Sequence, residues 1–200
     1  MKNIPCTGVI LAGGLNSRFS GANKAFLTIG DQCILDRIYG VYKDLFDEII
    51  IVSNDPLKYL EWDALIVSDI YQCRSSLTGI HAGLFHTGNP YAFIMACDTP
   101  FLKKELALHL LEKINGGYDA VIPETHAGLE PLCAVYSVKM VEPMAQQLER
   151  EQLKIRMLFK KRRVCMVSEK KLREQDPDLL SFYNVNTPDD LEKARRMIPV

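Results

Sequence analysis

The sequence lacks the cysteine and histidine spacings that metal and redox sites use. Its cysteines, at positions 6, 33, 73, 97, 133 and 165, form no CxxC pair, which excludes the common zinc, iron–sulfur and dithiol motifs. Cys97, Cys133 and Cys165 stand in apolar stretches, where a reduced thiol acts as a small core residue. The histidines at 81, 86, 109 and 126 lack a spacing such as HExxH, so we expect surface or hydrogen-bonded core residues.

A charge excess, a long hydrophobic run and a signal peptide are also absent. The net charge is −1, so no overall attraction to nucleic acid or an anionic membrane is expected, and any basic site must be local. No segment approaches the roughly 20 apolar residues of a membrane span. The first residues, MKNIPCTGVILAGG, lack the apolar run and cleavage site of a signal peptide. These absences predict a reduced, cytoplasmic protein without nucleic-acid or membrane partners.

Apolar residues, in contrast, are sufficient for one core. The chain has 200 residues, 48% of them hydrophobic, and no repeat or Pro/Gly-rich linker divides it, so one domain over 1–200 is expected. Apolar, β-branched runs predict strands at 7–12, 48–53, 64–68, 91–97, 118–123, 131–136 and 163–168. Helical spacing occupies 33–46 and 106–114, and Thr187 before Pro188 predicts another helix start. This alternation predicts an α/β fold, a three-layer sandwich with a mostly parallel sheet.

Polar residues follow several of the predicted strands. In chain order they are Gly13, Gly14, Arg18 and Lys24; Ser53, Asn54 and Asp55; Ser68 and Asp69; and Asp98 and Thr99. Ligands of open parallel sheets gather at the carboxyl ends of the strands. We therefore expect these groups to converge on one edge.

The glycine-rich stretch VILAGGLNSRFSGANKAF, residues 9–26, fits none of the common phosphate-loop motifs. No Gly-Lys-Ser/Thr follows as in a Walker A loop, and G-x-G-x-x-G is absent. An ordinary β-to-α turn is one interpretation. The other is a loop whose backbone N–H groups approach an anion while Arg18 and Lys24 neutralise phosphate charge. On this second interpretation, Asp98 offers the carboxylate oxygen that a triphosphate-bound Mg²⁺ requires.

Residues 11–30, LAGGLNSRFSGANKAFLTIG, carry a family resemblance. They are similar to the signature of nucleotidyltransferases, and within that superfamily the chain most resembles the molybdenum cofactor guanylyltransferases. Further matching segments follow in the expected order: SLTGIHAGL (76–84), MACDTPFL (95–102), EPLCAVY (130–136) and FYNVNTPDDL (182–191). The departures are Phe19 for the usual Met, Asn23 where Asp is common, and Ser75-Ser76 for Gly-Pro. They leave Lys24 and Asp98 intact.

The resemblance implies a nucleotide-diphospho-sugar transferase-like (Rossmann-like) fold and a specific reaction. GMP passes from GTP to molybdopterin-bound molybdenum, with pyrophosphate released and Mg²⁺ as cofactor. The resemblance further implies other molybdenum cofactor proteins and acceptor molybdoenzymes as partners. The implied catalytic residues are Lys24, Arg18 and Asp98, with Asp98 as metal ligand. The implied nucleotide-binding residues are Leu11, Ala12, Gly13, Gly14, Lys24, Asn54, Asp69 and Asp98, and the implied pterin or reaction-centre residues are Asn184, Asn186 and Asp189.

Each of these residues also has a plain structural interpretation. Asp98 can cap the following helix, and Lys24 and Arg18 can be solvated loop residues. The remaining polar residues can form turns or shape a helix start, namely Asn54, Asp69, Asn184, Asn186 and Asp189. The basic stretch at 154–163, which ends in KKRR at 160–163, is either a solvated face or an electrostatic funnel for a pterin phosphate.

Rival functions follow from the same residues. A cytidylyltransferase acting on a pterin or a sugar-type phosphate would share the loop, although cytidylyl branches usually carry LAAG or AAG. A nucleotide-binding regulatory protein would lack turnover. A non-catalytic adaptor would bind the cofactor without a nucleotide preference. Pyrophosphate release with each nucleotide separates these possibilities.

Overall fold

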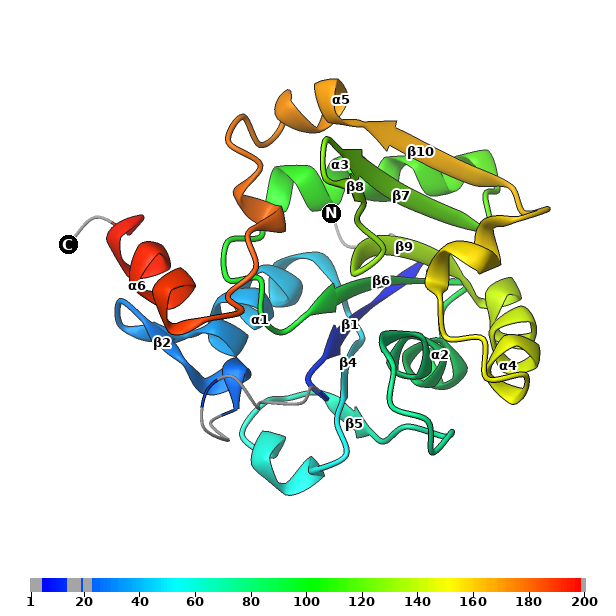
Figure 1. Cartoon of the computed structure of the whole chain (residues 1–200), viewed down its shortest axis with the longest axis horizontal. Helices are drawn as coiled ribbons and strands as arrows, with labels where there is room; N and C mark the ends of the chain where they lie inside the picture. Colours follow the sequence, from blue (N-terminus) through cyan, green and yellow to red (C-terminus); the bar gives the residue numbers. More distant parts are fainter. Residues whose placement is uncertain (1–4, 14–18, 20–22, 199–200) are drawn as a thin grey trace.

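The computed structural model describes residues 5–13, 19 and 23–198, and an eight-stranded sheet lies at the centre of this part of the chain (Figure 1). The strands lie in the order β10-β7-β9-β6-β1-β4-β5, and β8 pairs with β7. Their bounds are β1 Cys6–Leu11, β4 Ile49–Val52, β5 Leu65–Val67, β6 Tyr91–Ala96, β7 Ala120–Thr125, β8 Gly128–Leu129, β9 Cys133–Ser137 and β10 Val164–Ser168. A separate hairpin joins β2 Thr28–Ile29 to β3 Gln32–Cys33.

The register of the parallel strands brings their carboxyl ends to one level. Leu11, the last residue of β1, pairs with Val52 of β4 and with Ala96 of β6. Val52 pairs in turn with Val67, the last residue of β5. The segments that follow these four strands therefore start side by side at one edge of the sheet.

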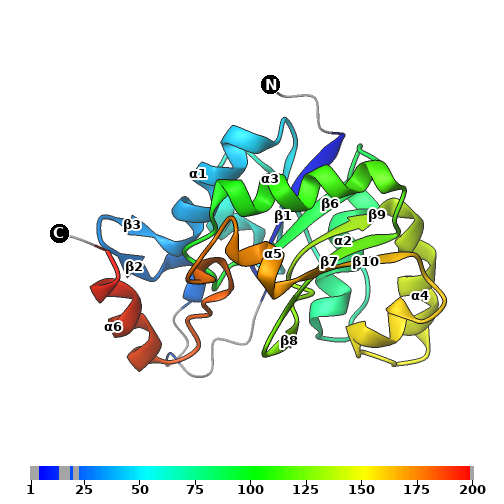
Figure 2. The ribbon, with the colours of Figure 1, turned by 90° about the horizontal axis from the view of Figure 1, so that it is seen from above.

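Helices cover both faces of the sheet and complete three layers (Figure 2). Their bounds are α1 Ile34–Leu45, α2 Ser76–His86, α3 Lys104–Glu112, α4 Val141–Glu149, α5 Glu169–Arg173 and α6 Pro188–Arg196. The 3₁₀ helices are η2 Lys24–Phe26, η3 Pro56–Tyr59, η4 Lys113–Gly116, η5 Val138–Met140, η6 Ile155–Phe159 and η7 Leu180–Phe182. One core cluster contains side chains of α1 and α3, and the other contains side chains of α2 and α4. None of the helices in the described residues has the length and apolarity needed to cross a membrane.

The apolar runs of the sequence are explained by this double covering. Val9 of β1 belongs to the cluster under α2, and its neighbour Ile10 belongs to the cluster under α1. Ile50 and Ile51 of β4 divide in the same way. Because successive side chains of a strand point to opposite faces, both faces must be apolar and no polar alternation appears.

The expected architecture is confirmed, with one strand of opposite direction. Each predicted strand is present, the helices of 33–46 and 106–114 correspond to α1 and α3, and Thr187 caps α6 with a reciprocal capping box to Asp190. The sheet is mostly parallel, but β9 runs antiparallel to both β6 and β7. The sequence did not indicate the β2–β3 hairpin, whose strands have two residues each.

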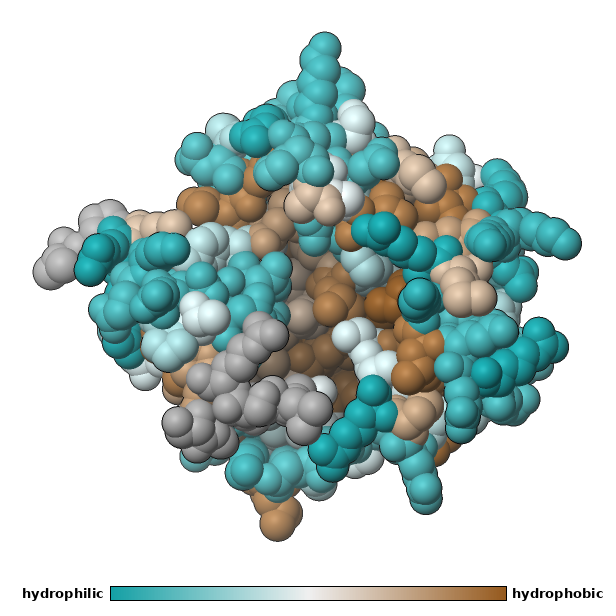
Figure 3. Space-filling model, in the orientation of Figure 1, coloured by the Kyte–Doolittle hydropathy of each residue, from teal (hydrophilic) through white to brown (hydrophobic). Residues whose placement is uncertain are grey.

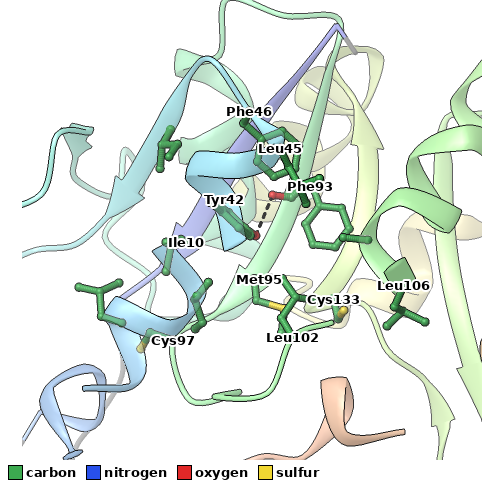
Figure 4. Close-up of a cluster of buried hydrophobic side chains, with 14 of the residues drawn as sticks. Ile10, Tyr42, Leu45, Phe46, Phe93, Met95, Cys97, Leu102, Leu106 and Cys133 are labelled. Atoms are coloured by element: carbon green, nitrogen blue, oxygen red, sulfur yellow. Dashed lines mark hydrogen bonds between the residues drawn. The ribbon is translucent and has the colours of Figure 1, made fainter. Parts of the chain in front are cut away.

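Tyr42 fixes α1 against the sheet (Figure 4). Its ring is fully buried beside Phe46 and Phe93, and its hydroxyl donates to the carbonyl oxygens of Phe93 at 3.3 Å and Val9 at 3.4 Å. Gly8 makes this approach possible, since a Cβ atom there would lie 2.5 Å from the Tyr42 ring. The first helix thus contacts the middle of β1 directly, at Gly8 and Val9.

Two helical glycines give a matched test of packing on the two faces. A Cβ atom at Gly83 of α2 would lie 2.5 Å from Cγ1 of the buried Val9, whereas a Cβ atom at Gly40 of α1 would meet nothing within 4 Å. We expect Gly83→Ala to destabilise the fold by roughly 1–3 kcal/mol through overpacking. Gly40→Ala should stabilise it by about 0.5–1 kcal/mol through helix propensity. Urea unfolding of the two variants measures both values, and equal effects would contradict the packing described.

Candidate active site

A cavity of about 460 Å³ lies where β1, β4 and β6 end. Figure 3 shows a hollow with hydrophobic residues in its floor and hydrophilic residues around it, on the face seen in Figure 1. Its walls come from segments far apart in the sequence: Leu11, Gly13, Lys24, Val52, Ser53, Asp69, Ser75, Ser76, Gly79, Ala96, Cys97, Asp98, Leu132, Asn184 and Asn186. A neighbouring cavity of about 420 Å³ shares part of this wall and adds Ala12, Asn23, Asn54, Asp55, Lys58, Tyr59 and Arg74. The convergence predicted from the strand ends is therefore present.

Lys24, Asp98 and Asn186 meet in the larger cavity. The Lys24 ammonium lies 3.3 Å from Oδ2 of Asp98 and donates to Oδ1 of Asn186 at 2.8 Å. The side chains of Lys24 and Asp98 are 15% and 22% exposed, so both are largely shielded but still open to the cavity. A cation, a carboxylate and an amide in this arrangement can hold a phosphate chain and a hard metal ion.

The position of Lys24 depends on a buried tyrosine. Asn23 caps η2 by accepting from the Ala25 N–H at 3.0 Å, and its amide donates to the Tyr59 hydroxyl at 2.7 Å. Tyr59 donates in turn to the Ala12 carbonyl oxygen at 3.1 Å. Burial raises the pKa of Tyr59, which keeps the phenol protonated as a donor. Asn23, which stands where Asp is common in the family, therefore connects η2 through Tyr59 to the end of β1.

Asp98 and Asn186 are held together by the C-terminal segment. The Val185 N–H donates to the Asp98 carbonyl oxygen at 2.8 Å. Asp190 accepts from the Asn186 N–H at 3.1 Å and from Thr187, and these hydrogen bonds lower the pKa of its carboxyl. The helix cap thus fixes the backbone of the residue whose side chain contacts Lys24.

A second set of contacts joins residues 176–181 to the segment after β6. Asp176 is fully buried and forms an ion pair with Lys103 at 3.2 Å. Its other oxygen accepts from the Ser181 N–H at 2.7 Å, and the Ser181 hydroxyl accepts from the Lys103 N–H at 2.9 Å. A buried carboxylate with a charged partner strongly disfavours opening, since separation would leave its charge uncompensated.

The other side of the site contains Asn54, Asp69 and the start of α2. Asn54 and Asp69 bond to each other, with the Asn54 amide donating to Oδ2 of Asp69 at 2.8 Å and accepting from the Asp69 N–H at 3.1 Å. The Ser75 hydroxyl accepts from the Thr78 N–H at 3.2 Å and so caps α2. Ser75 and Ser76, which replace the usual Gly-Pro, thus form a capped start of α2 on the cavity wall.

The remaining expected residues differ in position. Asn184 lines the larger cavity, whereas Asp189 is exposed in the first turn of α6 and lines neither cavity. Gly14 and Arg18 lie outside the described residues. The buried His81 has no hydrogen bond at Nδ1 within the described chain, so the expectation of a surface or hydrogen-bonded core residue is wrong for it. His109 is partly exposed, and its Nδ1 lies 3.9 Å from a Glu112 carboxylate oxygen.

The sequence did not indicate that Cys97 lines the larger cavity and Tyr59 the neighbouring one. Burial raises the pKa of the Cys97 thiol to about 12, so it stays protonated and is a poor nucleophile near neutral pH. All six cysteines are free, as expected from their spacing. The groups that face the cavity can therefore bind and orient charged ligands, and no activated nucleophile lies among its described lining residues.

Comparison with known proteins agrees with this geometry. The sequence profile of the MobA-like NTP transferase domain matches residues 8–166. A molybdenum cofactor guanylyltransferase from Desulfosudis oleivorans is 46% identical over 192 residues, which cover 96% of this chain and 95% of that protein.

Two solved structures are similar in fold. The molybdopterin-guanine dinucleotide biosynthesis protein A from Archaeoglobus fulgidus has a TM-score of 0.84 at 28% identity and covers 96% of this chain and 97% of that one. The 2-C-methyl-D-erythritol 4-phosphate cytidylyltransferase from Thermus thermophilus has a TM-score of 0.67 at 16% identity, covering 94% and 96%, and shares the fold alone. The expected nucleotide-diphospho-sugar transferase-like fold is confirmed, and the chain belongs to the MobA-like NTP transferase family.

Proposed function

We propose that this protein transfers GMP from GTP to the molybdenum cofactor, giving the guanine dinucleotide form and pyrophosphate. The observation that carries the proposal is the meeting of Lys24, Asp98 and Asn186 in one cavity at the strand ends. The 46% identity to a protein named for this activity supports it. We propose further that residues 1–200 act as one catalytic domain, because Lys24 and Asn186 come from opposite ends of the chain.

The proposed reaction is an in-line displacement at the α-phosphorus of GTP. An oxygen of the acceptor's terminal phosphate forms a bond to that phosphorus, and the bond to the bridging oxygen breaks as pyrophosphate leaves with the electron pair. Lys24 holds the triphosphate and offsets its developing charge, with Arg18 as a further proposed cation. Asn184 and Asn186 orient the reacting phosphate, and Asp189 belongs to the adjoining helix start.

Asp98 is the proposed ligand of the divalent metal, with Mg²⁺ as the proposed ion. Its Oδ2 contacts Lys24, and its side chain is open to the cavity. No group of three or more His, Cys, Asp or Glu side chains that could hold a metal occurs in the described residues. A site with one carboxylate fits Mg²⁺, which takes most of its other oxygens from substrate phosphates and water. The ion would neutralise charge on the triphosphate.

Ala12, Gly13 and Asn54 are the proposed base and ribose contacts, together with Leu11, Gly14 and Asp69. The Ala12 N–H donates to the Val52 carbonyl oxygen at 2.9 Å, and the Leu11 carbonyl oxygen accepts from the Cys97 N–H at 3.0 Å. The carbonyl of Ala12 accepts from Tyr59 and keeps a second lone pair. The N1–H and 2-amino groups of guanine are donors that suit such acceptors.

Removal of the Asp98 carboxylate tests the metal assignment. We expect Asp98→Ala to lower the rate of pyrophosphate release by about 10²-fold or more, as for loss of one preorganised electrostatic contact. Asp178→Ala, which removes an exposed carboxylate, should keep normal turnover. In urea unfolding, both variants should have a free energy of unfolding within about 1 kcal/mol of the wild-type value. A folded Asp98→Ala protein with normal turnover would exclude this role.

Chelation tests the metal requirement without a mutation. EDTA should abolish pyrophosphate release, because the triphosphate charge then lacks its counterion. Excess Mg²⁺ should restore the release. Full activity in EDTA would contradict a metal-dependent transfer.

Guanine selectivity tests the nucleotide assignment. Each unpaired buried polar group costs roughly 1–3 kcal/mol, so two lost partners amount to about a hundredfold preference for GTP over ATP. Pyrophosphate release with Mg²⁺ and each of the four nucleotides, with and without molybdopterin, measures this preference. GTP should also raise the melting temperature most at equal concentration. Better transfer with CTP would favour the cytidylyl alternative. Nucleotide binding without turnover would favour the regulatory protein, and binding of the cofactor without a nucleotide preference would favour the adaptor.

A further inference from the structure

One cationic side chain beside the candidate active site is not used by the proposed function. Arg74 lines the smaller cavity of about 420 Å³ and does not line the larger one. It belongs to the segment that connects β5 to α2 (Figure 1). Its side chain is exposed, and it makes no hydrogen bond or ion pair to another described residue. Its N–H donors are therefore available to a ligand in the cavity.

The remaining charges of this cavity are largely satisfied within the protein. Lys58 forms an ion pair with Asp55, whose Oδ2 lies 2.6 Å from the lysine Nζ. The Asp69 carboxylate accepts from the Asn54 amide at 2.8 Å. Two cations and two carboxylates line the described part of the cavity, so its formal net charge is zero. Such a wall gives a polyanion no net attraction, whereas it can bind an uncharged ring that carries hydrogen-bond acceptors.

The backbone on both sides of Arg74 is fixed by one buried residue, Thr78 of α2. The Thr78 hydroxyl donates to the Cys73 carbonyl oxygen at 2.7 Å, and the Thr78 N–H donates to the Ser75 hydroxyl at 3.2 Å. Ser75 stands where Gly is usual in the family, and a glycine has no hydroxyl to form this cap. Arg74 therefore extends from a held backbone, and its side chain can turn toward a ligand.

The two cavities hold different groups of proposed nucleotide contacts. Lys24 and Asp98, the proposed phosphate and metal residues, line the larger cavity and not the smaller one. Ala12 and Asn54, two of the proposed base and ribose contacts, line the smaller cavity and not the larger one. A nucleotide with its phosphates at Lys24 and its base at Ala12 therefore places the base, and not the phosphates, in the cavity of Arg74.

The edge of guanine that carries O6 and N7 matches a guanidinium group. Both atoms are acceptors, and the planar fork of arginine can donate one N–H to each of them. Adenine has an amino donor in place of O6, so donor would face donor. The N1–H and 2-amino donors of guanine lie on the adjoining edge, where backbone carbonyl oxygens such as that of Ala12 can accept from them.

We propose that Arg74 is a specificity-determining residue, which recognises guanine by donating to its O6 and N7 atoms. The inference rests on the proposed function, since GTP is the nucleotide assigned there. It gives the preference for guanine a side-chain source in addition to the backbone carbonyl oxygens at the end of β1.

The test combines one substitution with one change in the nucleotide. 7-Deaza-GTP carries a C–H group in place of N7 and so lacks one of the two acceptors. In calorimetric titrations with Mg²⁺ and without an acceptor, wild type should bind 7-deaza-GTP about tenfold or more weakly than GTP, as for the loss of a hydrogen bond to a charged donor. Arg74→Met should bind GTP about tenfold or more weakly than wild type does. In this variant the Kd values of GTP and 7-deaza-GTP should differ by less than about twofold, because the interaction that N7 makes is already absent.

Two controls separate recognition of this edge from a general loss of the site. ITP lacks only the 2-amino group, so its deficit relative to GTP should be the same in wild type and Arg74→Met. Arg196→Met removes an exposed arginine that lines neither cavity, and this variant should bind every nucleotide as wild type does. ATP should bind Arg74→Met no more weakly than it binds wild type, and all variants should melt alike without nucleotide.

Three results bear on whether the inference or the proposed function fails. An equal penalty for 7-deaza-GTP in wild type and Arg74→Met, or no penalty in either, would show that Arg74 does not contact N7 and would overturn the inference. Equal weakening of GTP and ATP in Arg74→Met would also overturn it, because the guanidinium would then contact a phosphate or the ribose. Absence of pyrophosphate release from wild type with GTP and molybdopterin would overturn the proposed function, whereas the titrations need no acceptor and still decide the role of Arg74.

Discussion

Register between parallel strands is the constraint on which the candidate active site depends. Leu11, Val52, Val67 and Ala96 end their strands at one level because their hydrogen-bonded pairs are fixed. A slip of one residue would move the end of a strand by about 3.3 Å and turn its side chains to the opposite face. Asp98, two residues beyond β6, would then no longer face Lys24. The interdigitated core on both faces of the sheet is what prevents such a slip.

Polar contacts outside the sheet bring the remaining residues of the site into place. The strands alone do not bring residue 186 to residue 24, and this step depends on hydrogen bonds from the C-terminal segment to the segment after β6. The ion pair between the buried Asp176 and the partly exposed Lys103 makes that docking specific, because neither charge has another ion-pair partner among the described contacts. The link from Asn23 through Tyr59 to Ala12 has the same effect on the opposite side. The site is therefore preorganised by two polar networks on one rigid sheet.

Most of the sheet could be predicted from the sequence because strands buried on both faces leave uninterrupted apolar runs. The helix start at Thr187 could also be predicted, since an N-cap is formed by residues that are close in sequence. Helix α2 was harder to detect, because it is buried on nearly all sides and has no amphipathic stripe. The direction of β9 could not be predicted, as it depends on which strands become its neighbours.

Within the site, Asp98 could be predicted because it follows a strand, and Lys24 because it stands beyond the glycine-rich stretch that follows β1. Tyr59 could not, since its contact with Ala12 joins positions that only the fold brings together. Asp189 is close in sequence to Asn186, yet the turn of α6 directs it to solvent. Position along the chain thus identifies site residues that stand next to a strand or a loop motif. It does not identify residues that reach the site only through tertiary packing.

The chain order of the wall residues has a consequence for biosynthesis. Leu11, Lys24, Val52 and Asp98 are translated well before Asn186, and domains emerge from the ribosome with their N-terminal part first. The nascent chain therefore contains the strand ends and the glycine loop before it contains the amide that contacts Lys24. A polypeptide truncated after β10 would keep every strand of the described sheet and lack the Asn184–Asn186 wall. Termination after β10 would thus yield a chain with an open site, because the residues that close it follow β10 in the chain.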